Sequence, residues 1–160
     1  MKARFTATLA LLALALPAAA TAGVTQSASG QGQIFIQTPT ASGTRTFSFN
    51  AETQSDGTTV GHAQLVNRFN DTILHIRLDC LRVIGNIASM SGEVTSTNTP
   101  IFDTFSEAVF SVLDNGEGAN APPDLISFAF FDLPLPGFDC QSQLFPPDLP
   151  IVNGNVQVRG

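Results

Sequence analysis

The sequence predicts an all-β domain, a single antiparallel meander arranged as a β-sandwich or a flattened barrel of about seven or eight strands. Three observations lead to this expectation. Apolar and polar residues alternate over short segments, turn dipeptides such as Asp-Gly and Asn-Gly recur between them, and no segment longer than a turn or two has the helical period. Because strands joined by tight turns usually pair, we expect neighbours in the chain to be neighbours in the sheet.

Residues 1–22 have the pattern of a signal peptide. Lys2 and Arg4 form a basic head, residues 5–16 are apolar, Pro17 interrupts the run, and the segment ends in the cleavage signal Ala-Thr-Ala. The run is too short to span a bilayer, and no later segment has about 18 consecutive apolar residues. We therefore expect a single mature domain, 23–160, that is exported to the periplasm or the cell exterior without stable membrane insertion.

The first part of this domain predicts three strands. A Ser- and Gly-rich stretch, 27–32, is interpreted as flexible, and the first strand covers 33–37. The second strand covers 44–53, where apolar residues such as Phe47 alternate with polar ones. An Asp-Gly turn then leads to the third strand, 58–69.

The middle of the chain predicts two strands joined by Gly85-Asn86. In the fourth strand, 72–84, the apolar phase changes at Leu81, which indicates a β-bulge or a part buried on both faces. The fifth strand covers 87–95, and its inward-facing residues are Ala88, Met90, Gly92 and Val94.

The last part predicts three strands and a long loop. The sixth strand, 104–113, is apolar on both faces, which is typical of a central strand. The seventh strand covers 125–131, and a short last strand covers 155–159. The loop 133–150 is rich in proline, which cannot donate to a regular ladder of hydrogen bonds.

Cys80 and Cys140 are the two cysteines of the chain. In an exported protein such a pair first indicates a disulfide, and two free thiols are the alternative. The bond would attach the proline-rich loop to the fourth predicted strand. It would close a loop of about 60 residues, which stabilises a fold by roughly 4 kcal/mol in the chain-entropy model.

Composition narrows the classes of partner. The chain has 7 Lys and Arg against 13 Asp and Glu, a formal net charge of −6 at pH 7. Nucleic acids and anionic lipids require a basic surface, so we expect neither as a partner. Cations, sugars and proteins of the cell surface remain as candidate ligands. The chain has no Trp and no Tyr, which removes the usual stacking platforms for sugar rings.

The most distinctive local motif is an acidic loop, 114–118, followed by Asp124. Calcium prefers a mixture of carboxylate, amide and carbonyl oxygens, so the candidate calcium ligands are Asp114, Asn115, Glu117 and Asp124. Their spacing differs from that of an EF-hand. The alternative is a hairpin loop in which Asp and Asn cap turns and Gly adopts positive φ.

A second candidate cluster consists of His62, His75 and Asp79, on the polar face of the third and fourth predicted strands. Two imidazoles and a carboxylate can bind a transition metal. The alternative is a solvated sheet face with cross-strand polar pairs.

Several segments resemble a group of small exported bacterial all-β proteins, modules of which also follow anchor-bearing domains in larger surface proteins. The resemblance is carried by 80–88, 91–92, 112–118 and Pro123-Asp124, within residues 45–131. It implies export and an all-β fold, and it implies no activity.

Two functional hypotheses follow. The favoured one is a non-enzymatic binding or structural module at the cell surface or in the periplasm, with long loops available for recognition. The alternative is a secreted hydrolase with a carboxylate- or calcium-assisted site at Asp114, Glu117 and Asp124. No Gly-x-Ser-x-Gly motif is present, and no residue is assigned as catalytic.

Overall fold

The computed structural model describes residues 23–37, 42–100, 106–118, 120–131, 138–142 and 145–160; the expected signal peptide, 1–22, lies outside them. These residues form strands, turns and loops, which confirms the all-β prediction. The strands are β1 (Val24–Gln37), β2 (Ser42–Gln54), β3 (Thr59–Asn67), β4 (Thr72–Ile84), β5 (Ile87–Thr97), β6 (Glu107–Leu113), β7 (Leu125–Ile126), β8 (Phe130–Phe131), β9 (Leu149–Pro150) and β10 (Asn153–Arg159).

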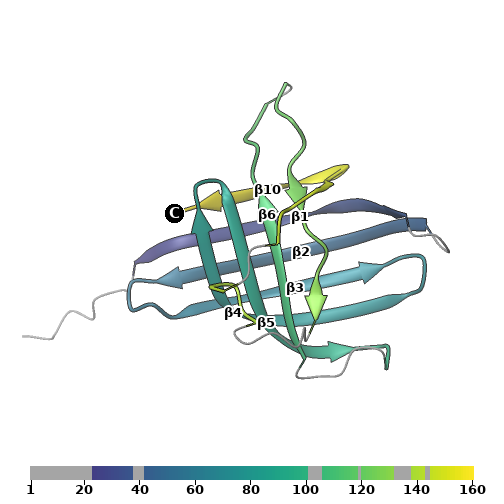
Figure 1. Cartoon of the computed structure of the whole chain (residues 1–160), viewed down its shortest axis with the longest axis horizontal. Helices are drawn as coiled ribbons and strands as arrows, with labels where there is room; N and C mark the ends of the chain where they lie inside the picture. The colour runs from purple at the N-terminus through teal and green to yellow at the C-terminus, as the bar shows by residue number, and fades with distance from the viewer. Residues whose placement is uncertain (1–22, 38–41, 101–105, 119, 132–137, 143–144) are drawn as a thin grey trace, which may run out of the picture.

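All ten strands belong to one antiparallel sheet, in the order β10-β1-β2-β3-β4-β5-β6-β7-β9, with β8 paired to β6. The sheet curls, so that β5, β6 and β7 cross over β1, β2 and β3 (Figure 1). Phe49 of β2 meets Phe110 of β6 inside this curl, with ring centroids 5.7 Å apart in an edge-to-face arrangement. Of the two predicted architectures, this half-barrel is closer to the flattened barrel, because the two layers are parts of one continuous sheet.

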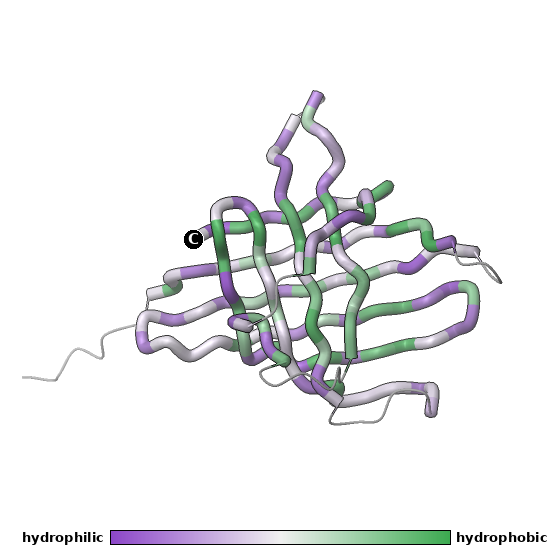
Figure 2. Tube along the Cα trace, viewed as in Figure 1, coloured by the Kyte–Doolittle hydropathy of each residue, from purple (hydrophilic) through white to green (hydrophobic). Residues whose placement is uncertain are grey.

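The strands have the alternation expected of a half-buried sheet. Hydrophobic and hydrophilic residues alternate along much of β2 and β4 (Figure 2). The inward positions form one apolar core, which includes Ile34, Phe47, Phe49, Leu65, Leu74, Ile76, Leu78, Met90, Val94, Phe110, Val112 and Val156. Among the described residues, no helix is long and apolar enough to cross a membrane.

Strand β1 corrects the prediction of a flexible stretch at 27–32. It is paired along this stretch with both β2 and β10, and Gly30 and Gly32 lie directly opposite Phe49 and Phe47. A Cβ at Gly30 would lie 3.0 Å from the Phe49 ring, and one at Gly32 would lie 3.1 Å from the Phe47 ring. The glycines are therefore required for close packing of the two rings, and they do not indicate mobility.

The predicted bulge in the fourth strand is confirmed. The register between β4 and β5 shifts between Leu78 and Cys80, and beyond the shift Leu81 is buried. A second shift, between His75 and Ile76, is not apparent from the sequence because the alternation continues across it. The residues predicted to face inward from β5 are all buried.

The central position predicted for the sixth strand agrees with the burial of β6 on both faces. The seventh predicted strand, however, is split into β7 and β8. Ser127 interrupts it, because its Oγ accepts a hydrogen bond from the backbone N–H of Ser111 at 2.9 Å. A side-chain oxygen thus takes the place of a strand carbonyl, while the Ser127 N–H still donates to Ser111 O at 2.8 Å, and regular pairing stops after this residue.

The expected meander holds from β1 to β7 and then ends. Strand β9 pairs with β7, whereas β10, two residues further on, pairs with β1. The Ile151 N–H donates to Asp124 O at 2.9 Å, and the Val152 N–H donates to Gln33 O at 2.9 Å. The segment 149–159 therefore joins the two ends of the sheet. Strand β9 has only two residues, and one of them is a proline, so the sequence shows no recognisable strand pattern there.

Candidate ligand-binding surface

The predicted acidic loop attaches β10 to the far end of the sheet. Asp124 is buried; its Oδ1 accepts the N–H of Asn115 at 2.8 Å, and its Oδ2 accepts the N–H of Val156 at 2.8 Å. Both carboxylate oxygens thus accept backbone donors, one from the loop itself and one from β10.

Asp114 binds β10 in the same way, at a residue two positions further along the strand. Its Oδ1 accepts the N–H of Gly116 at 2.8 Å, and its Oδ2 accepts the N–H of Val158 at 3.0 Å. Glu117 Oε1 accepts from Asn155 Nδ2 at 2.8 Å. Asp114 and Asp124 therefore act toward β10 as a neighbouring strand would, by accepting hydrogen bonds from its backbone N–H groups, whereas Glu117 accepts from a side chain of β10.

These contacts bear on the predicted calcium ligands. The N–H groups that Asp114 and Asp124 accept occupy part of the acceptor capacity that a calcium ion would use. The Asn115 side chain donates to Pro123 O at 2.7 Å. In the described part of the chain, no group of three or more His, Cys, Asp or Glu residues is placed to hold a metal ion. The loop has the contacts of the hairpin-loop alternative, in which Asp114 and Asp124 accept backbone N–H groups.

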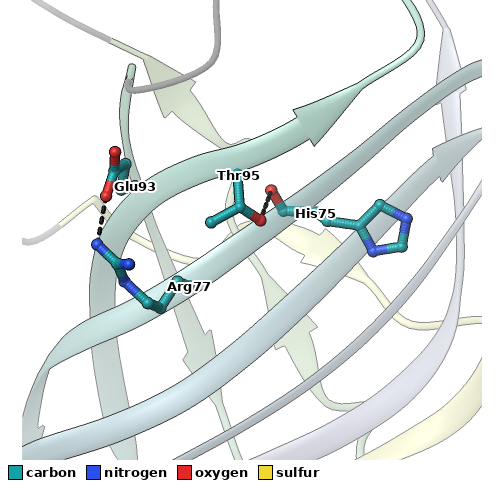
Figure 3. A network of polar contacts seen from close by, with 4 residues as sticks. All are labelled: His75, Arg77, Glu93 and Thr95. Atoms are coloured by element: carbon teal, nitrogen blue, oxygen red, sulfur yellow. Dashed lines mark hydrogen bonds and ion pairs between the residues drawn. The ribbon is translucent and has the colours of Figure 1, made fainter.

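His62, His75 and Asp79 are exposed on the outer face of the sheet, as predicted. His62 lies opposite Arg77 and His75 lies opposite Gln64, so the two imidazoles are diagonal neighbours. Arg77 forms an ion pair with Glu93 of β5, and the ring of His75 points away from that pair (Figure 3). The arrangement matches the alternative of cross-strand polar pairs on a solvated face.

The predicted disulfide between Cys80 and Cys140 is present, with the two Cα atoms 5.9 Å apart. It holds residues 138–142, here called the strap, against the outer face of β4 and β5. The Cys140 N–H donates to Ser91 Oγ at 3.2 Å, and Arg82 Nη1 donates to Gln141 O at 2.8 Å. Small serines on β5 allow this close approach, and Cys140 is fully buried.

Three adjoining hollows surround the N-terminal part of β1, and we call them together the β1 belt. The first, of about 370 Å³, is lined by Thr25, Gln26, Thr53, Gln54, Ser55, Gly57, Thr59, Leu81, Arg82 and Gln141. The second, of about 260 Å³, is lined by Val24, Thr25, Gln26, Ser27, Arg159 and Gly160. The third, of about 140 Å³, is lined by Ser27, Ala28, Ser29, Asn50, Ala51, Glu52, Gln157 and Arg159. The first and second hollows share Thr25 and Gln26, and the second and third share Ser27 and Arg159, so the three hollows adjoin one another around the N-terminal end of β1.

The first hollow exists because β3 and β4 separate. Their pairing ends at Gly61 and Leu78, whereas β4 continues to Ile84 paired with β5 alone. The strap lies beside the opening, since Gln141 donates to Leu81 O at 3.4 Å. The disulfide and the bulge therefore shape one wall of this hollow.

The third hollow follows from residue size along β1. Ser29 lies between Gln157 of β10 and Asn50 of β2, and Ser27 lies between the longer Arg159 and Glu52. The two serines form a low floor, and the longer side chains form walls. Sequence reasoning missed this site, because it assigned the Ser- and Gly-rich stretch to a flexible segment. The alternation of Ser with Ala and Gly in that stretch is the signal that could have revealed it.

The lining of the β1 belt is rich in hydroxyl and amide groups. Thr53 and Thr59 hydrogen-bond to each other at 2.8 Å, and Thr25 Oγ1 donates to Thr53 O at 3.1 Å. Amide and hydroxyl side chains both donate and accept, which suits a ligand that also carries hydroxyl groups. Arg82, Arg159 and Glu52 are the ionisable residues of the lining.

No protein-family model, no curated protein and no solved structure shows a significant match to this chain.

Proposed function

We propose that this chain is an exported, non-enzymatic binding module whose β1 belt binds a neutral, hydroxyl-rich polymer such as a polysaccharide. The observation that carries the proposal is the set of three adjoining hollows lined mainly by Thr, Ser, Gln and Asn side chains. Such groups exchange hydrogen bonds with water for hydrogen bonds with ligand hydroxyls at little net cost.

The net charge of the chain and the charges of the belt both favour a neutral ligand. The chain is acidic overall, which disfavours polyanions such as nucleic acids and anionic lipid surfaces. The belt includes one carboxylate, Glu52, and two guanidinium groups, Arg82 and Arg159, so it has no strong excess of either sign. A polymer without charge meets no large desolvation penalty at such a surface.

The absence of Trp and Tyr from the sequence sets the expected strength of binding. Without a large aromatic ring to stack on a sugar, a single contact is weak, and dissociation constants in the range of about 1 mM are expected. A polymer compensates by offering many copies of the same unit, which raises the apparent affinity through multivalency.

We also propose that the protein works in the periplasm or at the cell surface, as the N-terminal pattern and the disulfide suggest. The kinship with small exported bacterial β-proteins is part of the same proposal.

The test is retention of the purified protein on insoluble cellulose, chitin and starch. Binding to at least one polymer is expected, and the double variant Asn50→Ala/Gln157→Ala should weaken it by about tenfold, because two hydrogen-bonding walls of the third hollow are lost. Gln64→Ala is the matched control, since Gln64 is an amide on the same outer face that does not line the belt.

Two outcomes would overturn the proposal: no retention on any of the three polymers, or equal loss in the Gln64 control. Release of soluble sugar from a polymer by the wild-type protein would instead support a hydrolase.

A further inference from the structure

The chain contains three dipeptides in which an amide or acid side chain precedes glycine: Asp56-Gly57, Asn115-Gly116 and Asn153-Gly154. They share a reactivity, because glycine has no side chain to hinder attack of its backbone nitrogen on the side-chain carbonyl carbon of the residue before it. The attack requires this nitrogen to lose its proton, so a hydrogen bond that holds the N–H slows it. The contacts of each glycine N–H therefore decide which dipeptide reacts.

In two of the dipeptides the glycine N–H is bound. The Gly116 N–H donates to Asp114 Oδ1 at 2.8 Å, and the Gly57 N–H donates to Gln54 O at 2.9 Å. The side chain of Asn115 is held as well, since its Nδ2 donates to a backbone carbonyl at 2.7 Å. Both dipeptides thus lie in turns whose own hydrogen bonds protect the glycine nitrogen.

The N–H of Gly154 instead faces the open edge of β10. In an antiparallel strand the N–H groups of alternate residues point to the same edge. Those of Val156 and Val158 point away from β1, where two carboxylates of the acidic loop accept them. Gly154 is the preceding member of this series, and it is exposed. In the described part of the chain, no acceptor is seen for its N–H.

The side chain of Asn153 is exposed and loosely held. Among the described residues, the contact seen for it runs from its Nδ2 to Gln33 Oε1 at 3.4 Å, longer than an ordinary hydrogen bond. The backbone is irregular here, because the Val152 N–H donates to Gln33 O although Asn153 is the residue paired with Gln33. Water and the Asn153 side chain therefore both have access to the Gly154 nitrogen.

We propose that Asn153 is a site of spontaneous deamidation, and that formation of isoaspartate there weakens the attachment of β10. Water or hydroxide removes the Gly154 amide proton, the nitrogen forms a bond to Asn153 Cγ, and the side-chain nitrogen takes up a proton and leaves as ammonia. The succinimide that results is opened by one water molecule. Opening on one side gives aspartate in a normal backbone. Opening on the other gives isoaspartate, in which the side-chain carbons of residue 153 become part of the main chain.

The isoaspartate product lengthens the main chain by one carbon atom at a place where β10 has little room for it. A Cβ at Gly154 would lie 2.0 Å from Gln31 O and 2.4 Å from Gly32 Cα. Just before this point, the Val152 N–H fixes the entry to β10 by donating to Gln33 O at 2.9 Å. The additional atom therefore shifts β10 along β1 and away from the carboxylates that bind its outer edge.

The test compares the two Asn-Gly dipeptides in the same sample. The purified protein is incubated in mildly alkaline buffer and digested, and mass spectrometry detects replacement of the amide by a hydroxyl group. Asn153 should react at least about tenfold faster than Asn115 in the folded protein. In concentrated urea the two rates should be similar, because both residues precede glycine and the contacts of the fold are lost.

Variants separate the reaction from its effect on the strand. Asn153→Gln should abolish modification at this position, because its longer side chain would have to close a larger ring. Asn153→Asp carries the charge of the product on a normal backbone. The deamidated fraction of the wild-type protein, collected by ion exchange, should unfold at a lower urea concentration than Asn153→Asp, because this fraction also contains isoaspartate.

Three results would overturn the assignment of the site: no modification of Asn153 in the folded protein, equal rates at the two dipeptides in buffer, or the same preference for Asn153 in urea. A deamidated fraction as stable as Asn153→Asp would overturn the effect on β10. The reaction does not depend on the β1 belt, so failure here leaves polymer binding standing, and failure of polymer binding leaves this site standing.

Discussion

The carboxylate of Asp124 accepts a hydrogen bond from the backbone N–H of Val156 at 2.8 Å, across 32 residues of sequence. Asp124 precedes β7 at one end of the sheet, whereas Val156 lies in β10 at the other end. The bond, with its counterpart between Asp114 and Val158, satisfies donors on an edge that would otherwise be free. Exposed strand edges promote association, so this contact both closes the fold and protects it.

We expect Asp124→Ala to reduce the free energy of unfolding by about 3 kcal/mol, because it leaves the N–H groups of Asn115 and Val156 without their acceptor. Urea denaturation followed by circular dichroism measures the change. Asp148→Ala, at an exposed aspartate, should change stability by less than about 0.5 kcal/mol. A similar loss in both variants would contradict a specific role for Asp124.

Replacing both cysteines of the disulfide, Cys80→Ser with Cys140→Ser, should lower the free energy of unfolding by roughly 4 kcal/mol, in line with the length of the loop that is closed. Denaturation with and without a reducing agent provides the check. Reductant should destabilise the wild-type protein and leave the double variant unchanged. If reductant has no effect on the wild type, the bond contributes nothing measurable to stability.

Gly92→Ala should destabilise the protein by more than about 3 kcal/mol, because the added methyl has no room. A Cβ at Gly92 would lie 1.9 Å from the carbonyl oxygen of Arg77 and 2.7 Å from the Cα of Leu78, both backbone atoms of β4. Gly85→Ala is a useful comparison, since Gly85 has a φ of +61° in open space. The strain there should cost about 1 kcal/mol. Equal losses at the two sites would argue against steric contact with β4.

The strap should lose stability in acid through Asp139. Its carboxylate accepts the N–H groups of Ser142 at 2.8 Å and Gln141 at 3.0 Å, and these bonds lower the pKa of Asp139 in the folded protein. A lowered folded-state pKa contributes stability above the unfolded pKa of about 3.9 and loses it as the pH falls through the folded value.

Asp139→Asn should therefore be less stable than the wild type at pH 7, and the two should converge at low pH. Urea denaturation of both proteins across this range tests the expectation. A difference that is constant with pH would show that the ionised form of Asp139 does not matter to the strap.

Local patterns in the sequence were sufficient for most of the strands. Strict alternation between apolar and polar residues identifies β2 to β4, and the change of phase at Leu81 reveals the bulge, because both depend on which face of one strand each residue takes. The two cysteines indicate the disulfide by chemistry alone, since one cysteine pair in a chain that is expected to be exported has few alternatives.

Long-range pairing was decided by the tertiary structure. Residues 27–32 form a strand because they pair with β2 on one side and with β10 on the other, and because two phenylalanine rings pack over the glycines. The composition of the segment does not show either contact. Asp114 and Asp124 of the 114–124 loop accept hydrogen bonds from N–H groups of β10, so carboxylate oxygens of a type that can bind a cation bind backbone donors here. Arg45 follows the inward phase that the sequence assigns to β2, but Asn67 and Thr72 become its neighbours only through the register of three strands. Sequence thus determines which face each residue takes, whereas contacts between distant segments depend on how the sheet curls and closes.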